Sequence, residues 1–137
     1  MMNPFDDLIP ILTRRDLTQA QREALVDLVV WAMYVDGTIK HEENEQLDAV
    51  LKQLSTAAPI PMDRYLYTAL AKIRDAWSDP ERSERILTNI DARLETAEIR
   101  RTAYALCEAV TEADGELATT EATFLERVRR QFGLEDA

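Results

Sequence analysis

Two acidic elements of the form Asp-Gly-x-(Ile/Leu)-x-x-x-Glu contain the residues of this chain that are best suited to bind a ligand. The first holds Asp36 and Glu43, and the second holds Asp114 and Glu121, 78 positions later. Carboxylate oxygens are the ligands that Ca²⁺, Mg²⁺ and Mn²⁺ prefer, whereas soft metals favour sulfur and imidazole. These four carboxylates are therefore a candidate site, or pair of sites, for a divalent cation.

The spacing within each element matches the second half of a calcium-binding EF-hand loop, with Asp at the fifth position, Gly at the sixth and Glu at the twelfth. The first half does not match. Where that loop needs its leading oxygen ligands, the chain has Ala32 and Tyr34 in the first copy and Val110 and Glu112 in the second. Because calcium requires about six to eight oxygen ligands, a true EF-hand is excluded.

A looser cation site and a purely structural role both stay open for these carboxylates. Neighbouring acids that could complete such a site are Glu42 or Glu45 in the first copy and Glu112 or Glu116 in the second. In the structural alternative, an Asp before Gly accepts backbone N–H groups in the turn. A Glu in the first turn of a helix is likewise favoured by the helix dipole and by capping geometry.

His41 and Cys107 are the remaining residues with distinctive chemistry. His41 lies beside the first acidic turn and could be a further ligand or a proton shuttle. It aligns with Thr119 in the second copy and has no spaced histidine partner, so an exposed polar role is favoured. Cys107 is the only cysteine, which excludes an internal disulfide, favours the cytoplasm and predicts a packing role, since reactive thiols need an electropositive setting.

Apolar residues recur at spacings of three and four along almost the whole chain, and no run alternates as a strand would. The sequence therefore predicts an all-α protein. The expected helices span about 4–13, 18–36, 41–54, 62–77, 80–94, 96–113 and 119–132. Side-chain caps are expected at Thr18 (with Gln21), Asp79 and Thr96, and a glycine terminus at Gly133.

The offset of 78 positions extends beyond the two acidic elements. Further identities are Thr18 with Thr96, Leu28 with Leu106, Leu47 with Leu125, Val50 with Val128 and Gln53 with Gln131. This register predicts an internal duplication of one helix-turn-helix hairpin, with repeats at about 18–54 and 96–132 inside a single domain, 1–137. The two hairpins are expected to pack about a pseudo-twofold axis into a compact bundle of about seven helices.

The net charge of -10 and pI of about 4.6 oppose unaided binding to nucleic acid or to anionic membrane surfaces. The acids are concentrated around the two elements, because 36–48 carries a net charge of -4 and 108–126 carries -6. The N-terminus is acidic and no apolar run approaches the roughly 18 residues of a membrane span, so no membrane insertion is expected. A protein partner that binds the acidic surface fits this charge, and oligomeric state stays open.

Aromatic and arginine residues give two further predictions. Most of the aromatic side chains at Trp31, Tyr34, Tyr65, Tyr67 and Trp77 are expected in the core. If two or three were exposed together beside an acidic patch, they would mark a surface for a protein partner. The arginines of the last helix are expected to offset its C-terminal dipole and to pair with nearby acids, at Arg127, Arg129 and Arg130.

Two segments carry a resemblance to a known family: Val35-Asp36-Gly37-Thr38-Ile39 with Glu43, and Ala113-Asp114-Gly115-Glu116-Leu117 with Glu121. They resemble the Ala-Asp-Gly-x-(Ile/Val)-x-x-x-Glu pattern of the TerB-like family. These are helical domains associated with tellurite resistance, and they are also similar to the N-terminal region of a membrane-anchored DnaJ-like co-chaperone. The similarity extends from Thr18 to Gly133.

The resemblance implies an acidic helical bundle that binds divalent cations and serves in stress-response or membrane-associated complexes. The family's carboxylates map to Asp36, Glu43, Asp114 and Glu121. This chain departs from the pattern at Val35, where the family has Ala, and at the two capping positions, which hold Lys40 and Ala118. Lys40 places a positive charge next to the first element, which weakens the case for a cation there.

The sequence contains no nucleophile elbow, phosphate-binding glycine loop, dinucleotide fingerprint or zinc-protease helix. We therefore expect a non-enzymatic accessory or sensing domain whose acidic turns bind a divalent cation or a protein partner. The alternative is a metal-dependent enzyme, hydrolase-like or stress-detoxifying, with the same carboxylates as ligands. An enzyme would need a concave pocket in which the acids converge and leave coordination positions open.

Overall fold

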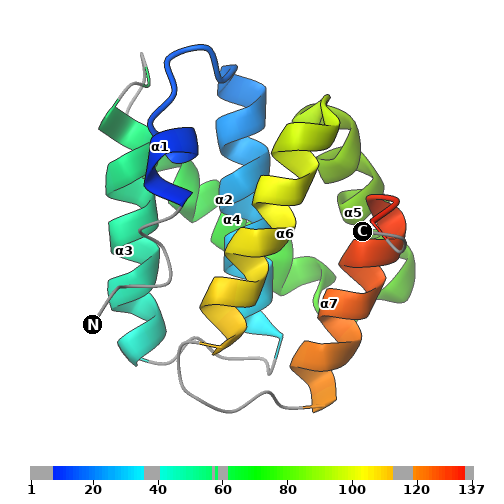
Figure 1. The fold of residues 1–137 in the computed structure, drawn as a ribbon. Coiled ribbons are helices and arrows are strands. Elements are labelled where there is room, and N and C mark those ends of the chain that lie inside the picture. Colours follow the sequence, from blue (N-terminus) through cyan, green and yellow to red (C-terminus); the bar gives the residue numbers. More distant parts are fainter. Residues whose placement is uncertain (1–7, 36–40, 57, 59–61, 113–118, 135–137) are drawn as a thin grey trace.

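The computed structural model describes residues 8–35, 41–56, 58, 62–112 and 119–134, and every regular element within these ranges is an α-helix. The prediction of an all-α fold is confirmed (Figure 1). The helices are α1 (Ile9–Leu12), α2 (Gln19–Tyr34), α3 (His41–Thr56), α4 (Asp63–Ala76), α5 (Pro80–Leu94), α6 (Ala97–Glu112) and α7 (Thr119–Gln131).

Local capping interactions start the helices where the sequence predicts. The Thr18 hydroxyl accepts a hydrogen bond from the backbone N–H of Gln21 at 3.0 Å, and the Gln21 side chain accepts one from the backbone N–H of Thr18 at 2.8 Å. This reciprocal pair is a capping box, which satisfies two N–H groups that lack helical partners. The side chains of Asp79 and Thr96 cap α5 and α6 more simply, by accepting hydrogen bonds from first-turn N–H groups.

The last helix ends in a left-handed residue, as predicted. Gly133 has φ of 72°, a conformation that glycine adopts without steric cost. Its position lets the backbone N–H of Leu134 donate to the carbonyl of Arg129 at 3.0 Å, which satisfies a carbonyl that the helix leaves open.

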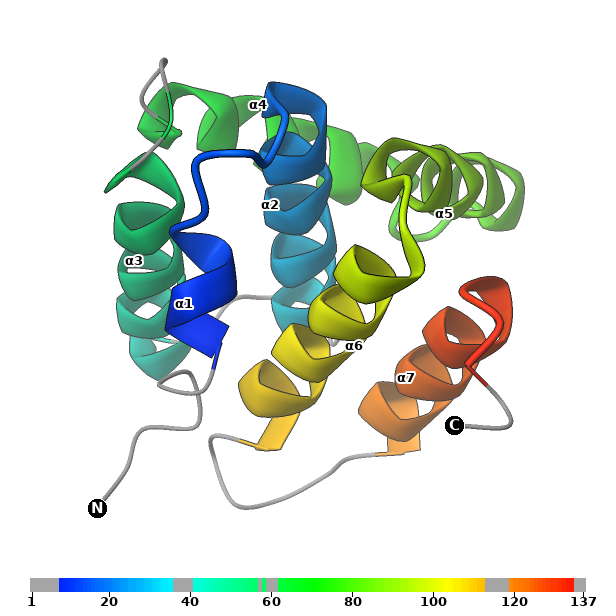
Figure 2. The ribbon, with the colours of Figure 1, turned by 45° about the horizontal axis from the view of Figure 1, so that its top comes forward.

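Helix α2 runs through the middle of the molecule and contacts α3, α4, α5 and α6. In Figure 2, α4 and α5 run across the top of the view, while α3, α6 and α7 follow one another below them. Helix α7 packs against α5 and α6. Among the described helices, none combines the length and apolar character that crossing a bilayer requires.

Because other helices surround it, α2 has no solvent-facing stripe. Twelve of its 16 residues are buried, including every residue from Ala24 to Met33. One of them is Asp27, whose side chain is 0% exposed. A buried carboxylate needs charged or hydrogen-bonding partners, because removal from water strongly disfavours its ionised form.

Three side chains from two other helices supply these partners to Asp27. The Lys72 ammonium donates to its carboxylate at 2.8 Å, and the Tyr65 hydroxyl donates at 2.8 Å. Both come from α4, and the Arg93 guanidinium from α5 completes the set. The cluster therefore ties α4 and α5 to the central helix.

Several predicted features lie outside the described residues: the first part of the helix expected at 4–13, the Gly37 terminus of α2 and the proline loop at 59–61. Residues Ile9–Leu12 confirm the later part of that first helix. The internal duplication stays a prediction, because two helical hairpins of similar length do not establish a repeat.

We predict that Asp27→Ala lowers the free energy of unfolding by about 3 kcal/mol, the low end of the range for a broken buried pair, because it leaves the partly buried charges of Lys72 and Arg93 without a carboxylate. Urea unfolding followed by circular dichroism measures the change. The control is Arg82→Gln, which removes an exposed ion pair with Asp79 and should cost at most about 1 kcal/mol. Equal losses in the two variants would contradict the assigned importance of the buried cluster.

The same cluster predicts a loss of stability at alkaline pH. Burial raises the pKa of Tyr65 above 10.0. Burial alone would lower the pKa of Lys72, but hydrogen bonds to Asp27 and Tyr65 outweigh it and raise that pKa above 10.5. The folded protein therefore holds both protons more tightly than the unfolded protein. The stabilisation that these two groups contribute is fully present below their unfolded-state pKa values and is lost as pH rises through their raised folded-state pKa values.

The double variant Tyr65→Phe with Lys72→Met should show a smaller loss of unfolding free energy than the parent between about pH 9.5 and 12. Both proteins are measured by urea unfolding across that range. The parent's other tyrosines are retained in the variant, so a parallel decline in the two proteins would assign the alkaline loss to groups outside the cluster.

Candidate functional site

The helix ends that border the two acidic elements lie at one end of the molecule. In Figures 1 and 2, the C-terminal ends of α2 and α6 and the N-terminal ends of α3 and α7 are all at the bottom of the view. The ends of α2 and α3 are far in sequence from those of α6 and α7, so the fold brings the borders of the two acidic elements to the same end of the molecule.

Of the four candidate ligands, the described residues include only the side chain of Glu121. Asp36, Asp114 and the side chain of Glu43 lie outside them, as does the side chain of His41. Glu121 stands in the first turn of α7 and is only 8% exposed. Its carboxylate therefore lies near the N-terminal, positive end of the α7 dipole.

No cluster of three or more His, Cys, Asp or Glu side chains able to hold a metal ion occurs among the residues that the structure describes. Three of the four candidate ligands are not among them, so a cation site formed by these carboxylates stays a prediction.

A cavity of about 300 Å³ connects the borders of the two elements. Its lining includes Val35, which precedes Asp36 in the chain, and Thr119, the first residue of α7. The wall is otherwise formed by Trp31, Trp77, Thr120, Thr123, Phe124 and Arg127. Val35, which leads into the first element, and Thr119, which lies within the second, thus line the same cavity.

Aromatic side chains hold the shape of this cavity. The rings of Trp31 and Phe124 lie with centroids 5.3 Å apart, and Trp77 meets the ring of Tyr34 edge-on at 6.1 Å. The indole N–H of Trp77 donates to the carbonyl of Val35 at 3.0 Å. Trp31 is buried, as expected, but Trp77, which lines this cavity, is 47% exposed and Tyr67 is 76% exposed, so the expectation of a core position is wrong for these two.

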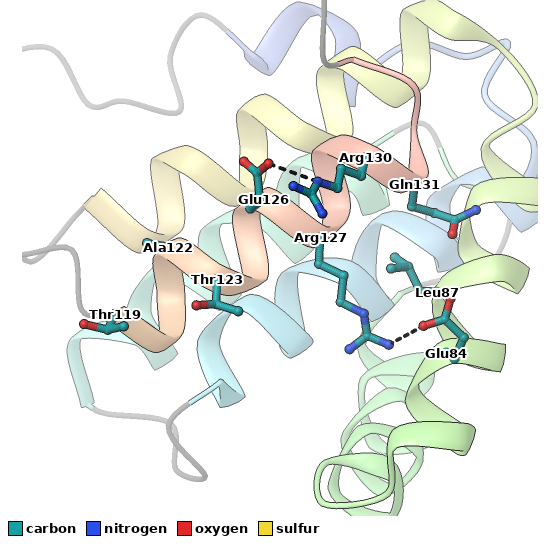
Figure 3. A pocket seen from close by; sticks show the side chains of 9 residues that line it. All are labelled: Glu84, Leu87, Thr119, Ala122, Thr123, Glu126, Arg127, Arg130 and Gln131. Carbon is teal, nitrogen blue, oxygen red and sulfur yellow. Dashed lines mark hydrogen bonds and ion pairs between the residues drawn. The ribbon is translucent and has the colours of Figure 1, made fainter.

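A second and larger cavity, of about 630 Å³, lies between α5 and α7 (Figure 3). Thr119, Thr123 and Arg127 line both this cavity and the aromatic cavity, so the two cavities are neighbours along α7. Glu84 and Leu87 of α5 form the opposite wall. We call this larger cavity the α5–α7 groove.

The arginines of α7 are paired, as predicted. Arg127 donates to the Glu84 carboxylate at 2.9 Å, and its guanidinium lies 5.3 Å from the centroid of the Trp31 ring. Arg129 and Arg130 both pair with Glu126, at 2.6 and 3.1 Å. The charges along the groove are therefore matched within the protein.

Cys107 is fully buried in the core, which confirms the predicted packing role. Burial raises the pKa of its thiol above the usual range, because the thiolate would lie in an apolar setting. A nucleophilic or metal-binding role for this residue does not fit its surroundings.

Comparison with known proteins agrees with this arrangement of acidic elements on helical hairpins. Residues 22–137 match the family model for tellurite resistance protein TerB. The chain belongs to the TerB family. The match covers both Asp-Gly elements and every helix from α3 to α7, as well as nearly all of α2. No curated protein and no solved structure gave a match to this TerB-family chain.

Sequence reasoning missed two features of this TerB-family domain. The first is the partnership of Asp27 with α4 and α5, although a lone acid inside the apolar run 24–33 was an available signal. The second is the gathering of Trp31 and Trp77 around one cavity. That arrangement brings together residues from two different helical segments, and no local sequence pattern predicts it.

The burial of Cys107 predicts that a thiol-specific aromatic disulfide such as dithiobis(nitrobenzoate) reacts with folded protein far more slowly than with protein unfolded in urea. Absorbance of the released thiolate measures both rates. Since the chain has no other cysteine, the unfolded sample is its own control. Similar rates in the two samples would mean that the helix around Cys107 opens readily.

Proposed function

We propose that this TerB-family chain is a non-enzymatic accessory or sensing domain in a tellurite-resistance-like stress response. We further propose that its acidic turns bind a divalent cation through Asp36, Glu43, Asp114 and Glu121. The observation that carries this proposal is the common location of the helix ends that border both turns, at the bottom of Figure 1.

Two structural features support the cation-binding part. Val35 and Thr119, one from the border of each turn, line the same cavity, so the end of α2 and the start of α7 lie close to one another. Glu121 is a buried acid in the first turn of α7, which keeps a carboxylate at this end of the bundle. A set made only of carboxylates suits Ca²⁺, Mg²⁺ or Mn²⁺, which take oxygen ligands.

The adjoining cavity supports an accessory role over catalysis. Its described lining is aromatic, aliphatic, threonine and arginine, with no carboxylate among the lining residues. A metal-dependent hydrolase would instead need its metal ligands to converge on an open pocket that admits a substrate. A surface of this kind is better suited to receive another protein.

A metal titration of chelator-treated protein tests the proposal. We expect Ca²⁺, Mg²⁺ or Mn²⁺ to raise the thermal midpoint in a saturable manner. A ligand that binds only the folded state adds RT ln(1 + [L]/Kd), about 2.7 kcal/mol at 100 times Kd. Zn²⁺ is included to detect a site that prefers nitrogen or sulfur ligands.

The double variant Asp114→Asn with Glu121→Gln should lose the metal-dependent rise, whatever its midpoint without metal. A matched control is Asp63→Asn with Glu98→Gln, which removes one Asp and one Glu from the first turns of α4 and α6. This control should keep the rise. A rise that survives unchanged in the first variant refutes the residue assignment, and no rise at millimolar metal leaves the acids with turn and capping roles only.

A further inference from the structure

A third cavity, of about 320 Å³, lies between α4 and α5, the two helices that cross the top of Figure 2. Its lining consists of Lys72, Asp75 and Ala76 from α4 and Arg82, Arg85 and Ile86 from α5. This volume is at the small end of the range for small-molecule sites, about 300–1,000 Å³. Three cationic side chains and one carboxylate give the lining a net charge of +2, in a chain whose net charge is -10. We call it the α4–α5 cavity.

The two arginines of the α4–α5 cavity keep most of their hydrogen-bond donors open. Arg82 comes no closer than 3.5 Å to the Asp79 carboxylate, and its guanidinium donates no hydrogen bond within the part of the chain that the structure describes. Arg85 donates one long hydrogen bond there, from Nε to the carbonyl of Glu81 at 3.4 Å. By contrast, the arginines of the α5–α7 groove are each paired with a carboxylate. The guanidinium groups of the α4–α5 cavity are therefore available to a ligand.

Lys72 connects this cavity to the buried cluster around Asp27. Its ammonium donates to Asp27 and to the Tyr65 hydroxyl, both at 2.8 Å, which uses two of its three N–H groups. The third has no acceptor among the described residues, and 31% of the side chain is exposed. Asp27 is also paired with Arg93, so two cations share one carboxylate and the cluster has a net charge of +1. The buried cluster therefore adds to the positive charge of the cavity and does not cancel it.

The position of Arg82 is not explained by the stability of its own helix. Arg82 stands in the first turn of α5, which begins at Pro80. The dipole of a helix favours negative charge at this end and disfavours a cation. An anion bound beside Arg82 would interact favourably with both the guanidinium and the helix dipole. Unpaired donors, surplus positive charge and the helix dipole thus all favour an anionic ligand in the same cavity.

We propose that the α4–α5 cavity binds the dianionic phosphate group of a small ligand, either inorganic phosphate or a small phosphate ester. The guanidinium groups of Arg82 and Arg85 bind its oxygens, as this planar group commonly does, and the remaining N–H of Lys72 donates from the α4 side. Ile86 offers an apolar surface to the organic part of an ester. The site uses none of the carboxylates of the acidic turns, so it adds a second ligand to the proposed function and does not depend on the cation.

Amide chemical shifts of isotope-labelled, chelator-treated protein test this site. The probes are inorganic phosphate, glycerol phosphate and phenyl phosphate, each titrated at about 0.15 M sodium chloride, which screens general attraction. We expect saturable shifts centred on 72–76 and 82–86, with a Kd of about 1 mM or tighter for at least one probe. Tighter binding of an ester identifies an ester as the ligand, and tighter binding of inorganic phosphate identifies the free ion. No saturable shift with any probe at about 10 mM overturns the proposal.

Substitutions of exposed side chains locate the anion with little risk to the fold. Arg82→Gln and Arg85→Gln should each weaken binding about fivefold or more, because each removes a charged donor. Asp75→Asn removes the one acid of the lining and should tighten binding about twofold or more, because it removes a repulsive charge. The matched control is Arg74→Gln, which removes an exposed cation of α4 that lines none of the cavities described above. It should leave the Kd within about twofold.

Equal weakening by Arg74→Gln and Arg85→Gln would assign the attraction to overall charge and overturn the proposal. Affinity that is unchanged in both Arg82→Gln and Arg85→Gln would overturn it as well. These titrations contain no divalent metal, and the variants leave the four carboxylates of the acidic turns in place. Their failure is therefore distinct from failure of the metal titration.

Discussion

The enclosure of α2 is the constraint on which the rest of this structure depends. A helix that is apolar on every side must be surrounded, and its one acid in the apolar run, Asp27, must be paired once it leaves water. Lys72 and Arg93 meet that need from α4 and α5. The central helix therefore specifies which helices lie against it and at what height along its axis.

This arrangement also decides where the functional surfaces lie. With α2 at the centre and α6 beside it, the C-terminal ends of both helices come to the same end of the molecule. Trp77, which follows α4, is held there by the Val35 carbonyl at the end of α2. The aromatic cavity and the borders of both acidic turns are thus consequences of how the core is packed.

The proposed cation site and the aromatic cavity share the boundary formed by Val35 and Thr119. A cation held by the acidic turns would fix the ends of α2 and α7 that form the cavity wall. A ligand in that cavity and the cation would then change each other's affinity, in the reciprocal manner that thermodynamic linkage requires.

The sequence by itself determined the helices, their caps at Thr18 and Gly133, the acidic charge and the family. These features depend on composition, or on hydrogen bonds and periodicities within a few residues. The tertiary structure alone decided that Asp27 meets Lys72 and Arg93, and that two distant tryptophans share one cavity. Those contacts join segments more than 40 positions apart, and their geometry follows from how whole helices enclose α2, which no local pattern encodes.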